Sequence, residues 1–580
     1  MNNLEFLGKY KKLQNGSDIR GVALEGVEGQ NVNLSEREVF NISQSFVLWL
    51  SKQLDLTPGD IKVAVGRDSR ISGPNLIAAS LEGIENQKAK AIDTGLSSTP
   101  AMFMSTVFPE IKANGSIMLT ASHLPWNRNG MKFFAPSGGL DKSDITEILI
   151  RAAELELENQ PYSNCLEKNS KNSQDPKYYR NRNTPIDGLG MEVLEDKNNR
   201  EAKNWASNKT FEKFPLMARY SEHLRDLILK GVRQNSEALP LENPEVQNVE
   251  NIQALPLEDL EFLPLKGMRI IVDAGNGAGG FFATDVLAPL GADTSGSMYL
   301  DPDGTFPNHP PNPEDPSALV DLCQEVLNRQ GDLGLIFDTD VDRAAAVDSK
   351  GREIARNRIV ALAATFAKEK SPGTTVVTDS VTSTQLQDFI ENQLGLVHHR
   401  FKRGYRNVIN ESIRLNASGI DSQLAIETSG HGAFKDNYFL DDGAYLATLI
   451  TIKATILKRE GKEISHILDT LEDPLEAMEI RLPISHADFQ TYGDEVLADL
   501  KNWVRDLNDQ DIQLELPNYE GVRVKLSGKH GEGWFLLRKS LHDPLMPLNI
   551  ESNESGGTNK IRALLRPFFL NFQYLDTENL

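Results

Sequence analysis

The chain has 580 residues, of which 39% are hydrophobic and 25% are charged, as in an ordinary water-soluble globular protein. Since a single hydrophobic core does not grow to this size, we expect roughly three to five domains. The formal net charge of −22 argues against nucleic acid and anionic membranes as partners, because both repel an acidic protein.

The cellular compartment is predicted from signals that the sequence lacks. No stretch approaches the roughly 18 to 20 apolar residues that cross a bilayer, and the first residues, MNNLEFLGKYKK, lack the apolar core of a secretory signal. Cys165 and Cys323 are the two cysteines, and their contexts differ, so a disulfide framework is not expected. These features predict a cytoplasmic protein.

The first α/β unit is predicted to open at residues 61–83, where an apolar strand, an aspartate in a turn and an amphipathic helix follow one another. The apolar run at residues 116–119 then predicts a buried strand, which delivers Ser122 to a turn rich in helix breakers. We expect Ser122 to lie on an exposed loop. The adjacent His123 is weak support for a nucleophile, because neighbouring side chains rarely point toward each other.

Two further segments, residues 269–291 and 374–395, repeat the pattern of strand, turn and helix, which predicts related α/β domains. Gly275, Gly277 and Gly280 in the first of them satisfy G-x-G-x-x-G, but the acidic residue of a dinucleotide site is not found at the end of a second strand. Nicotinamide dinucleotide binding is therefore not expected.

Three aspartates end the apolar strand that begins near Leu333. Asp338, Asp340 and Asp342 alternate along the chain, and Arg343 follows them. Converging carboxylates repel one another unless a hard cation neutralises them, so this set predicts a site for Mg²⁺ or Mn²⁺. An EF-hand is excluded, because its sixth position requires Gly and its twelfth requires Glu, where this chain has Arg and Ser.

These motifs resemble those of the alpha-D-phosphohexomutases. The serine loop TASHLPWNRNGMK precedes the alternating-aspartate loop, as in that family. Four more segments match in order: SDIRG at residues 17–21, DTGLSSTP at 93–100, DPDGTFPNHPPNPE at 301–314 and ETSGH at 427–431.

The resemblance implies three similar mixed-sheet α/β domains and a smaller C-terminal α+β domain around a central cleft. Short strand-like runs at residues 478–482, 522–526, 534–537 and 548–551 agree with the last of these. We predict domain 1 at residues 1–213 with the phosphoserine loop, domain 2 at 214–355 with the metal loop, domain 3 at 356–473 with the sugar loop, and domain 4 at 474–580 for phosphate binding. Residues 159–213 and 235–263 lack sustained periodicity and are expected to be surface insertions.

The implied reaction interconverts hexose 1-phosphate and hexose 6-phosphate. A phosphoserine at Ser122 gives its phosphate to the sugar, a hexose 1,6-bisphosphate forms and turns over, and the other phosphate returns to the serine. Mg²⁺ on the three aspartates and a phosphoserine oxygen would stabilise charge, as would Lys132 and Arg343. The general base is left open between His431, Lys132 and Arg20. A hexose 1,6-bisphosphate is expected as activator.

The resemblance also implies which residues bind the substrate. Glu427 and Ser429 would bind sugar hydroxyls, and Arg403, Arg538 and Ser540 would bind phosphate. The SGH ending resembles bacterial enzymes that accept glucose and mannose phosphates. The expected partners are small phosphosugars, and the expected state is a monomer or a homodimer.

Two departures from the family pattern leave alternatives open. Leu124 stands where the family usually has Asn, and residues 538–544 read RKSLHDP where the family has R-x-S-G-T-E-P. If this altered loop lets the bisphosphate escape, the protein would be a glucose 1,6-bisphosphate synthase. A non-catalytic phosphosugar-binding relative is the third alternative, but such a protein has no need of a nucleophile and a metal loop.

Overall fold

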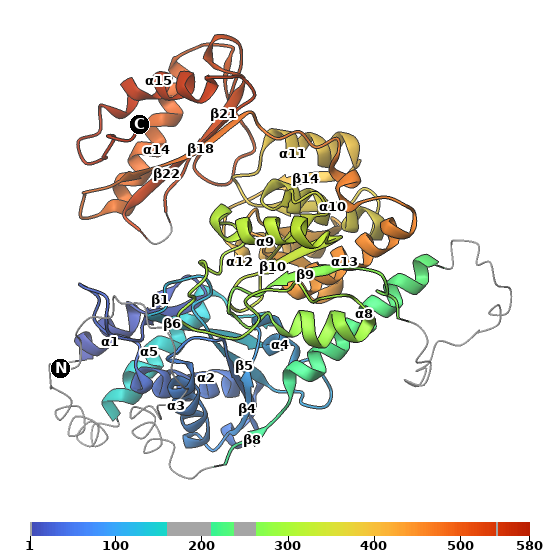
Figure 1. The fold of residues 1–580 in the computed structure, drawn as a ribbon. Helices are drawn as coiled ribbons and strands as arrows, with labels where there is room; N and C mark the ends of the chain where they lie inside the picture. Colours follow the sequence, from blue (N-terminus) through green and yellow to red (C-terminus); the bar gives the residue numbers. More distant parts are fainter. Residues whose placement is uncertain (1–2, 159–209, 237–262, 541–542) are drawn as a thin grey trace, which may run out of the picture. The chain divides into compact units, whose positions relative to one another are not determined.

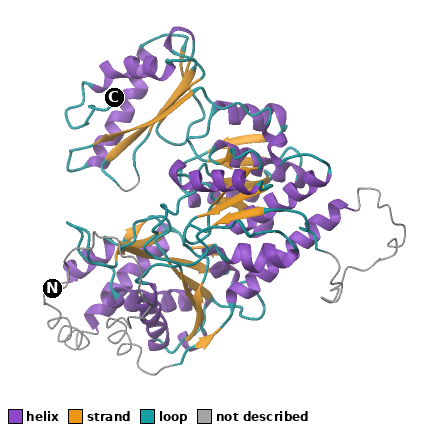
Figure 2. Cartoon of the chain, viewed as in Figure 1, coloured by secondary structure: helices purple, strands orange, loops and turns teal. Residues whose placement is uncertain are grey.

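The computed structural model describes residues 3–158, 210–236, 263–540 and 543–580. The chain forms two compact units, one of Met1–Ser97 with Met102–Leu216 and one of Ser98–Ala101 with Met217–Leu580. Each unit combines helices with β-sheets (Figures 1 and 2). The predicted α/β class with mixed sheets is confirmed.

The first unit contains one mixed sheet with the strand order β1-β2-β6-β5-β3-β4-β8, and β7 pairs with β6. β3 is parallel to β4 and β5, whereas β6 is antiparallel to β5 and β2. The strands are β1 (Gln14–Asn15), β2 (Asp18–Val22), β3 (Lys62–Arg67), β4 (Lys90–Leu96), β5 (Gly115–Leu119), β6 (Arg128–Ala135), β7 (Gly138–Gly139) and β8 (Glu212–Lys213).

Helices of the first unit pack against one another and bury one apolar core. They are α1 (Asn3–Lys11), α2 (Glu36–Leu54), α3 (Gly73–Asn86) and α5 (Lys142–Glu158); α4 (Thr99–Met104) starts in the Ser98–Ala101 segment, and η1 (Pro58–Asp60) is a 3-10 turn. Gly83 lets α3 approach α2 closely, because a Cβ there would lie 2.4 Å from the Phe40 carbonyl oxygen. The predicted α/β opening is confirmed by β3 and α3, and the next predicted strand is β5.

The second unit opens with α8 (Leu216–Ser236) and a four-stranded sheet of order β12-β11-β10-β9. β9 (Ile270–Asp273) is parallel to β10 (Leu333–Phe337), which turns back antiparallel into β11 (Ala344–Asp348); β12 (Glu353–Ile354) forms the edge. α9 (Pro316–Arg329) packs against this sheet through Leu322 and Val326. The turn between β10 and β11 carries the three aspartates.

The helix predicted after β9 differs from the expectation. It is a π-helical turn, η5 (Phe282–Leu287), followed by a 3-10 turn, η6 (Ala288–Leu290), in which Pro289 lacks the N–H that a regular helix needs. The glycines before it allow close packing: a Cβ on Gly277 would lie 2.7 Å from the Thr339 carbonyl oxygen, and one on Gly280 would lie 2.4 Å from that of Leu300. Close packing against the aspartate loop thus accounts for Gly277, and close packing against Leu300 accounts for Gly280.

A third sheet has the order β14-β13-β15-β16-β17. The second strand in this order, β13, is parallel to β14 and β15, and β16 is antiparallel to β15. The strands are β13 (Thr375–Thr378), β14 (Val397–Arg400), β15 (Ser422–Ile426), β16 (Gly432–Phe434) and β17 (Leu440–Asp441). The helices and turns are α10 (Asn357–Lys370), α11 (Thr384–Asp388), η7 (Phe389–Gln393), α12 (Tyr405–Ala417), η8 (Lys435–Asn437), α13 (Gly443–Arg459) and η9 (Ile464–Leu468).

The fourth sheet is antiparallel, with the order β18-β22-β21-β20-β19, and α14 and α15 complete its core. The elements are β18 (Glu476–Pro483), α14 (Phe489–Asp506), β19 (Ile512–Leu514), β20 (Val522–Leu526), η10 (Gly528–His530), β21 (Gly533–Leu537), β22 (Leu545–Ser552) and α15 (Gly557–Phe569). All four strands predicted in this region are confirmed, and β19 was not predicted.

Most of the two predicted insertions lies outside the described residues. The described ends of both belong to secondary structure, because Glu212–Lys213 forms β8, which pairs with β4, and α8 extends to Ser236. Among the described helices, none is both long and apolar enough to span a bilayer.

Candidate active site

The serine loop begins where β5 ends. Ser122 has a φ of 50°, a left-handed conformation that residues other than glycine rarely adopt, and it is only 5% exposed. The expected exposure is therefore wrong for Ser122 itself, although His123 and Pro125 of the same loop are exposed. The reason is Arg70, a fully buried residue whose guanidinium donates a hydrogen bond to the Ser122 carbonyl and holds the loop inward. Backbone strain of this kind is concentrated at functional sites.

Lys132 and Arg20 lie on two paired strands beside this loop. Lys132, which is buried, is on β6, the strand that returns from the loop and pairs with β5. Arg20 is on β2; its Nη1 donates to the Thr120 carbonyl at 3.2 Å, and its Nη2 lies 2.8 Å from Asp18 Oδ2. The neighbouring strands β2, β6 and β5 therefore bring Ser122, Lys132 and Arg20 to one region of the first unit. The other predicted site residues belong to the second unit.

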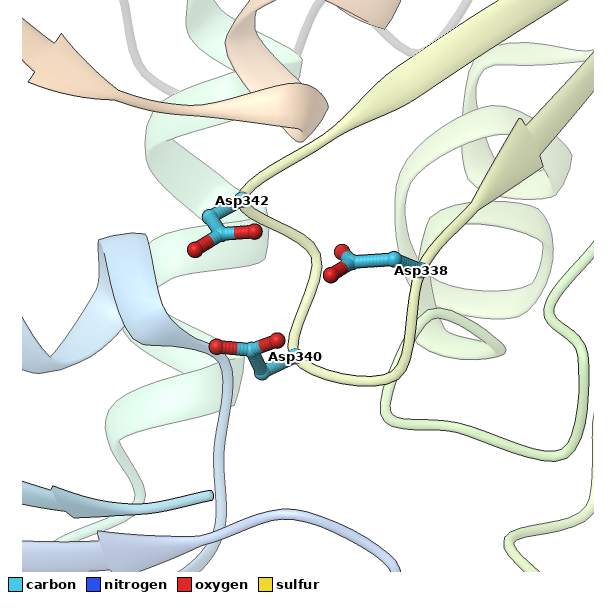
Figure 3. A group of neighbouring side chains, drawn as sticks. All are labelled: Asp338, Asp340 and Asp342. Atoms are coloured by element: carbon cyan, nitrogen blue, oxygen red, sulfur yellow. The ribbon is translucent and has the colours of Figure 1, made fainter. Parts of the chain in front are cut away.

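The three aspartates converge in the β10–β11 turn (Figure 3). Asp338, Asp340 and Asp342 are all buried, and one carboxylate oxygen of each lies within 4.8 Å of the others. Val341, between the last two, has a φ of 67°, which is strained for a β-branched residue. The turn holds this conformation because the Gly443 N–H donates to the Val341 carbonyl at 3.0 Å.

The donor set fits a hard divalent cation. Carboxylate oxygens are the ligands that Mg²⁺ prefers, and three buried carboxylates this close together need a positive charge. Arg343 supplies part of it, since its Nη2 lies 3.1 Å from Asp338 Oδ2. On the other side of the turn, Thr99 donates through its hydroxyl to Asp340 Oδ2 and through its N–H to the Asp340 carbonyl.

The ETSGH segment forms the β15–β16 turn and packs against the aspartate loop. Arg343 and His431 form a β-bridge, and His431 Nε2 lies 3.6 Å from Asp342 Oδ1. The other ring nitrogen, Nδ1, is 2.8 Å from Ser429 Oγ, and the ring stacks on Tyr405 with a centroid distance of 5.6 Å. Within the second unit, the ETSGH turn and the aspartate loop are therefore in direct contact.

Glu427 is a buried acid in this turn, and its Oε1 accepts a hydrogen bond of 2.6 Å from the Gly404 N–H. Burial, together with the nearby Asp379 carboxylate, raises the pKa of Glu427 to about 8, although Arg403 acts in the opposite direction. The carboxyl group is therefore largely protonated at neutral pH. A protonated acid can both donate and accept hydrogen bonds, which suits recognition of hydroxyl groups.

The residues predicted to bind phosphate are only partly brought together. Arg403 pairs with Glu314 at 2.8 Å. Arg538 is 9% exposed, its Nε finds no hydrogen-bond partner among the described residues, and burial and the nearby Arg403 lower its pKa. An anion bound there would give Nε a hydrogen-bond partner and would offset the repulsion between Arg538 and Arg403. Ser540 Oγ accepts from the Asp543 N–H at 3.2 Å, and residues 541–542 between them lie outside the described residues.

Several contacting residues were missed from sequence. They are Arg70 behind the serine loop, Thr99 and Asn312 beside the aspartate loop, Glu314 beside Arg403, and Tyr405 against His431. Three of them stand in segments that resemble the family motifs, namely Thr99 in DTGLSSTP and Asn312 and Glu314 in the segment that ends PNPE. These motifs could have indicated the three residues as site residues. Arg70 and Tyr405 lie outside every motif that resembles the family, so nothing in the sequence indicated their roles.

Comparison with known proteins decides the family. Sequence models of the three alpha/beta/alpha domains of phosphoglucomutase/phosphomannomutase match residues 11–159, 249–351 and 355–474. The chain belongs to the alpha-D-phosphohexomutase family. It is thus a phosphohexomutase, an intramolecular phosphotransferase, with an acidic triad able to hold a metal ion.

Relatives of this phosphohexomutase span nearly its full length. A phosphomannomutase/phosphoglucomutase from Pseudomonas aeruginosa is 25% identical over 522 residues, which cover 89% of this chain and 90% of that one. A phosphoglucomutase from Neisseria meningitidis is 25% identical over 506 residues, or 87% of each chain. A phosphoglucosamine mutase from Deinococcus radiodurans is 28% identical over 503 residues, or 86% of this chain and 87% of that one.

A solved structure shows the same fold. A phosphoglucomutase/phosphomannomutase family protein from Burkholderia thailandensis superposes with a TM-score of 0.65 at 22% identity, covering 97% of both chains. The phosphoglucomutase parafusin from Paramecium gives a TM-score of 0.60 at 15% identity, covering 92% of this chain and 90% of that one.

Proposed function

We propose that this phosphohexomutase interconverts hexose 1-phosphate and hexose 6-phosphate, with glucose as the sugar and mannose as the second candidate. The names of the Pseudomonas and Neisseria relatives support these sugars. The observation that carries the proposal is the convergence of three buried carboxylates beside a turn that presents Glu427, Ser429 and His431. Such an arrangement suits a phosphorylated sugar.

The covalent step that we propose starts from a phosphoserine at Ser122. The bond between the serine oxygen and phosphorus breaks, and a bond from a sugar hydroxyl to the same phosphorus forms, which gives a hexose 1,6-bisphosphate. The hydroxyl proton passes to a general base, for which His431, Lys132 and Arg20 are the candidates, and the released Ser122 oxygen takes up a proton, which restores the serine hydroxyl. In the reverse sense, the other phosphate returns to Ser122. A hexose 1,6-bisphosphate loads the serine in the first place.

The chain's other residues bind and orient the substrate in this proposal. Arg343 and Lys132 offset the charge of the transferring group, and Glu427 and Ser429 bind sugar hydroxyls. Arg403, Arg538 and Ser540 hold the phosphate that does not react. Asp338, Asp340 and Asp342, with the phosphoserine oxygen, would hold Mg²⁺, which supplies Lewis-acid stabilisation of phosphoryl transfer when it is bound.

The domain boundaries that we propose are residues 213, 355 and 473. The segments that match the family's three domains, and the separate sheets of the second unit, support this division.

The altered segment RKSLHDP supports one alternative, synthesis of glucose 1,6-bisphosphate. In this alternative, loss of the family's Gly and Thr from the loop would weaken its hold on the bisphosphate, which would then leave before it turns. The test is to incubate the protein with Mg²⁺, glucose 6-phosphate and a sugar bisphosphate. A mutase forms glucose 1-phosphate without net bisphosphate gain, and Ser122→Ala abolishes this. Accumulation of glucose 1,6-bisphosphate as the main product would contradict the mutase proposal.

A further inference from the structure

Arg70 lies in the turn between β3 and α3 and has no place among the substrate-binding groups. Arg70 is 0% exposed, so solvent does not reach its guanidinium. A buried charge of this size is costly unless it is paired and hydrogen-bonded. Asp68, also fully buried, supplies the pairing charge, with Oδ2 at 3.3 Å from Arg70 Nε and Oδ1 accepting from the Arg70 N–H at 2.9 Å.

The guanidinium donates to four backbone carbonyls of the serine loop. Nη2 bonds to the carbonyls of Ser122 at 2.5 Å and Leu124 at 2.6 Å. Nη1 bonds to those of Pro125 at 2.8 Å and Arg128 at 2.9 Å. One side chain thus fixes the loop on both sides of its turn. No other side chain could do the same, because the planar fork of arginine presents donors in fixed directions, whereas lysine offers one compact ammonium.

The backbone of the loop that Arg70 holds is strained at Ser122, the proposed phosphate carrier. Ser122 takes its φ of 50° although it is not glycine, and a residue persists in this region only where its surroundings hold it there. Local hydrogen bonding contributes through the Thr120 hydroxyl, which accepts from the Ser122 N–H at 2.9 Å. The four bonds from Arg70 supply the tertiary part of that restraint.

We propose that Arg70 is a positioning residue for phosphoryl transfer: it sets the place and direction of Ser122 and does not touch the substrate. The inference rests on the proposed function, in which Ser122 carries the phosphate. In-line transfer is sensitive to the placement of the reacting oxygen, and a displacement of about 1 Å can cost about 100-fold in rate. The loop is held through carbonyl groups, so the side chain of Leu124 is free to differ from the family's Asn.

The test compares Arg70→Lys and Arg70→Met with the wild-type chain. We expect kcat to fall about 10-fold in the lysine variant, which keeps the charge, and about 100-fold in the methionine variant, with KM for glucose 1-phosphate within about 3-fold of wild type. The split arises because the residues proposed to bind sugar belong to the second unit. If the methionine variant does not fold, the lysine variant decides.

The control is Arg37→Lys, on α2, where Arg37 pairs with Glu156 of α5 at 2.7 Å. This control measures how much stability is lost when a partly buried arginine of the same unit is replaced. The midpoint of thermal unfolding should change, but kcat should not. An Arg70→Lys variant with wild-type kcat, or with kcat reduced only by its unfolded fraction, overturns the inference. A wild-type chain that never carries phosphate on Ser122 overturns the proposed function instead, and intact mass distinguishes the two failures.

Discussion

Glu427 is deeply buried, and its proposed role in binding a sugar hydroxyl depends on its proton. The neighbouring Asp379 carboxylate accepts hydrogen bonds from the Thr428 N–H and hydroxyl, and with burial it raises the pKa of Glu427. With a pKa raised to about 8, Glu427 enters the neutral pH range as an acid that can donate to a sugar oxygen. Its ionisation would place a second charge beside Asp379 and remove that donor.

Glu427→Gln should therefore remove a pH dependence rather than abolish activity. For the wild-type chain, kcat/KM should fall as pH rises through about 8, because Glu427 loses its proton there. The amide keeps an acceptor for the Gly404 N–H and a donor for the sugar, so the variant should lack this decline. The measurement is the pH profile of kcat/KM between pH 6 and 9. If kcat/KM of the variant declines with pH as in the wild type, the decline arises from the ionisation of another group.

The same acid predicts how stability changes with pH. Its folded pKa is above its unfolded value of 4.5, so the contribution of the proton to stability is complete below pH 4.5 and is lost as pH rises through about 8. Glu427→Gln does not titrate, so its unfolding midpoint should fall less than that of wild type between pH 6 and 9. Thermal unfolding at both pH values checks this, and parallel curves would refute it.

The aspartate loop depends on the close approach of a glycine from another turn. A Cβ on Gly277 would lie 2.7 Å from both the Cα and the carbonyl oxygen of Thr339, which stands between two of the aspartates. Gly277→Ala should therefore displace the loop, destabilise the chain by about 1–3 kcal/mol and weaken Mg²⁺ binding. Chemical denaturation and titration calorimetry with Mg²⁺ measure the two effects.

Gly59→Ala is the matched control. Its Cβ would meet nothing nearer than 3.8 Å, so stability and metal affinity should stay at wild-type levels. Equal metal affinity in both alanine variants would show that the packing of Gly277 does not position the carboxylates.

Local pattern predicted the strands that lead into the site but not the contacts that build it. The strand before Ser122 and the strand before Asp338 are short apolar runs. Such runs are predictable because they are buried whatever their tertiary neighbours are. The burial of Ser122 and the stacking of Tyr405 on His431 depend on partners about 25 to 50 residues away, which periodicity does not specify. The prediction of a regular helix after β9 was wrong for a local reason, because Pro289 interrupts an otherwise amphipathic segment.

Within the second unit, a cluster of charges joins the sheet β18-β22-β21-β20-β19 to the segment that follows β13 and to the end of β14. Glu515 pairs with Arg523 at 2.9 Å and with Arg400, while Arg523 also donates to the Ser380 and Thr382 carbonyls. Arg523 is 1% exposed and lies 3.5 Å from the ring centroid of Trp534. Burial, with the adjacent Arg400, lowers the pKa of Arg523 to about 9, so the carboxylate is needed to hold two arginines together.

Glu515→Gln should consequently destabilise the second unit. Removing this carboxylate should cost about 1–3 kcal/mol, because Arg523 stays buried beside Arg400, although Glu515 itself is 25% exposed. Glu479→Gln is the control, since its partner Arg481 is 72% exposed and such pairs contribute about 0–1 kcal/mol. Denaturant unfolding measures both, and equal effects would contradict a stabilising role for Glu515.

The most direct test of the account is the intact mass of the chain during one turnover. After treatment with a hexose 1,6-bisphosphate, we expect a form about 80 Da heavier than the unmodified chain, which is the mass of one phosphoryl group. With Mg²⁺ and glucose 1-phosphate the added mass should disappear, with EDTA it should persist, and Ser122→Ala should never gain it. A stable unphosphorylated chain that still interconverts the two sugar phosphates would contradict the account.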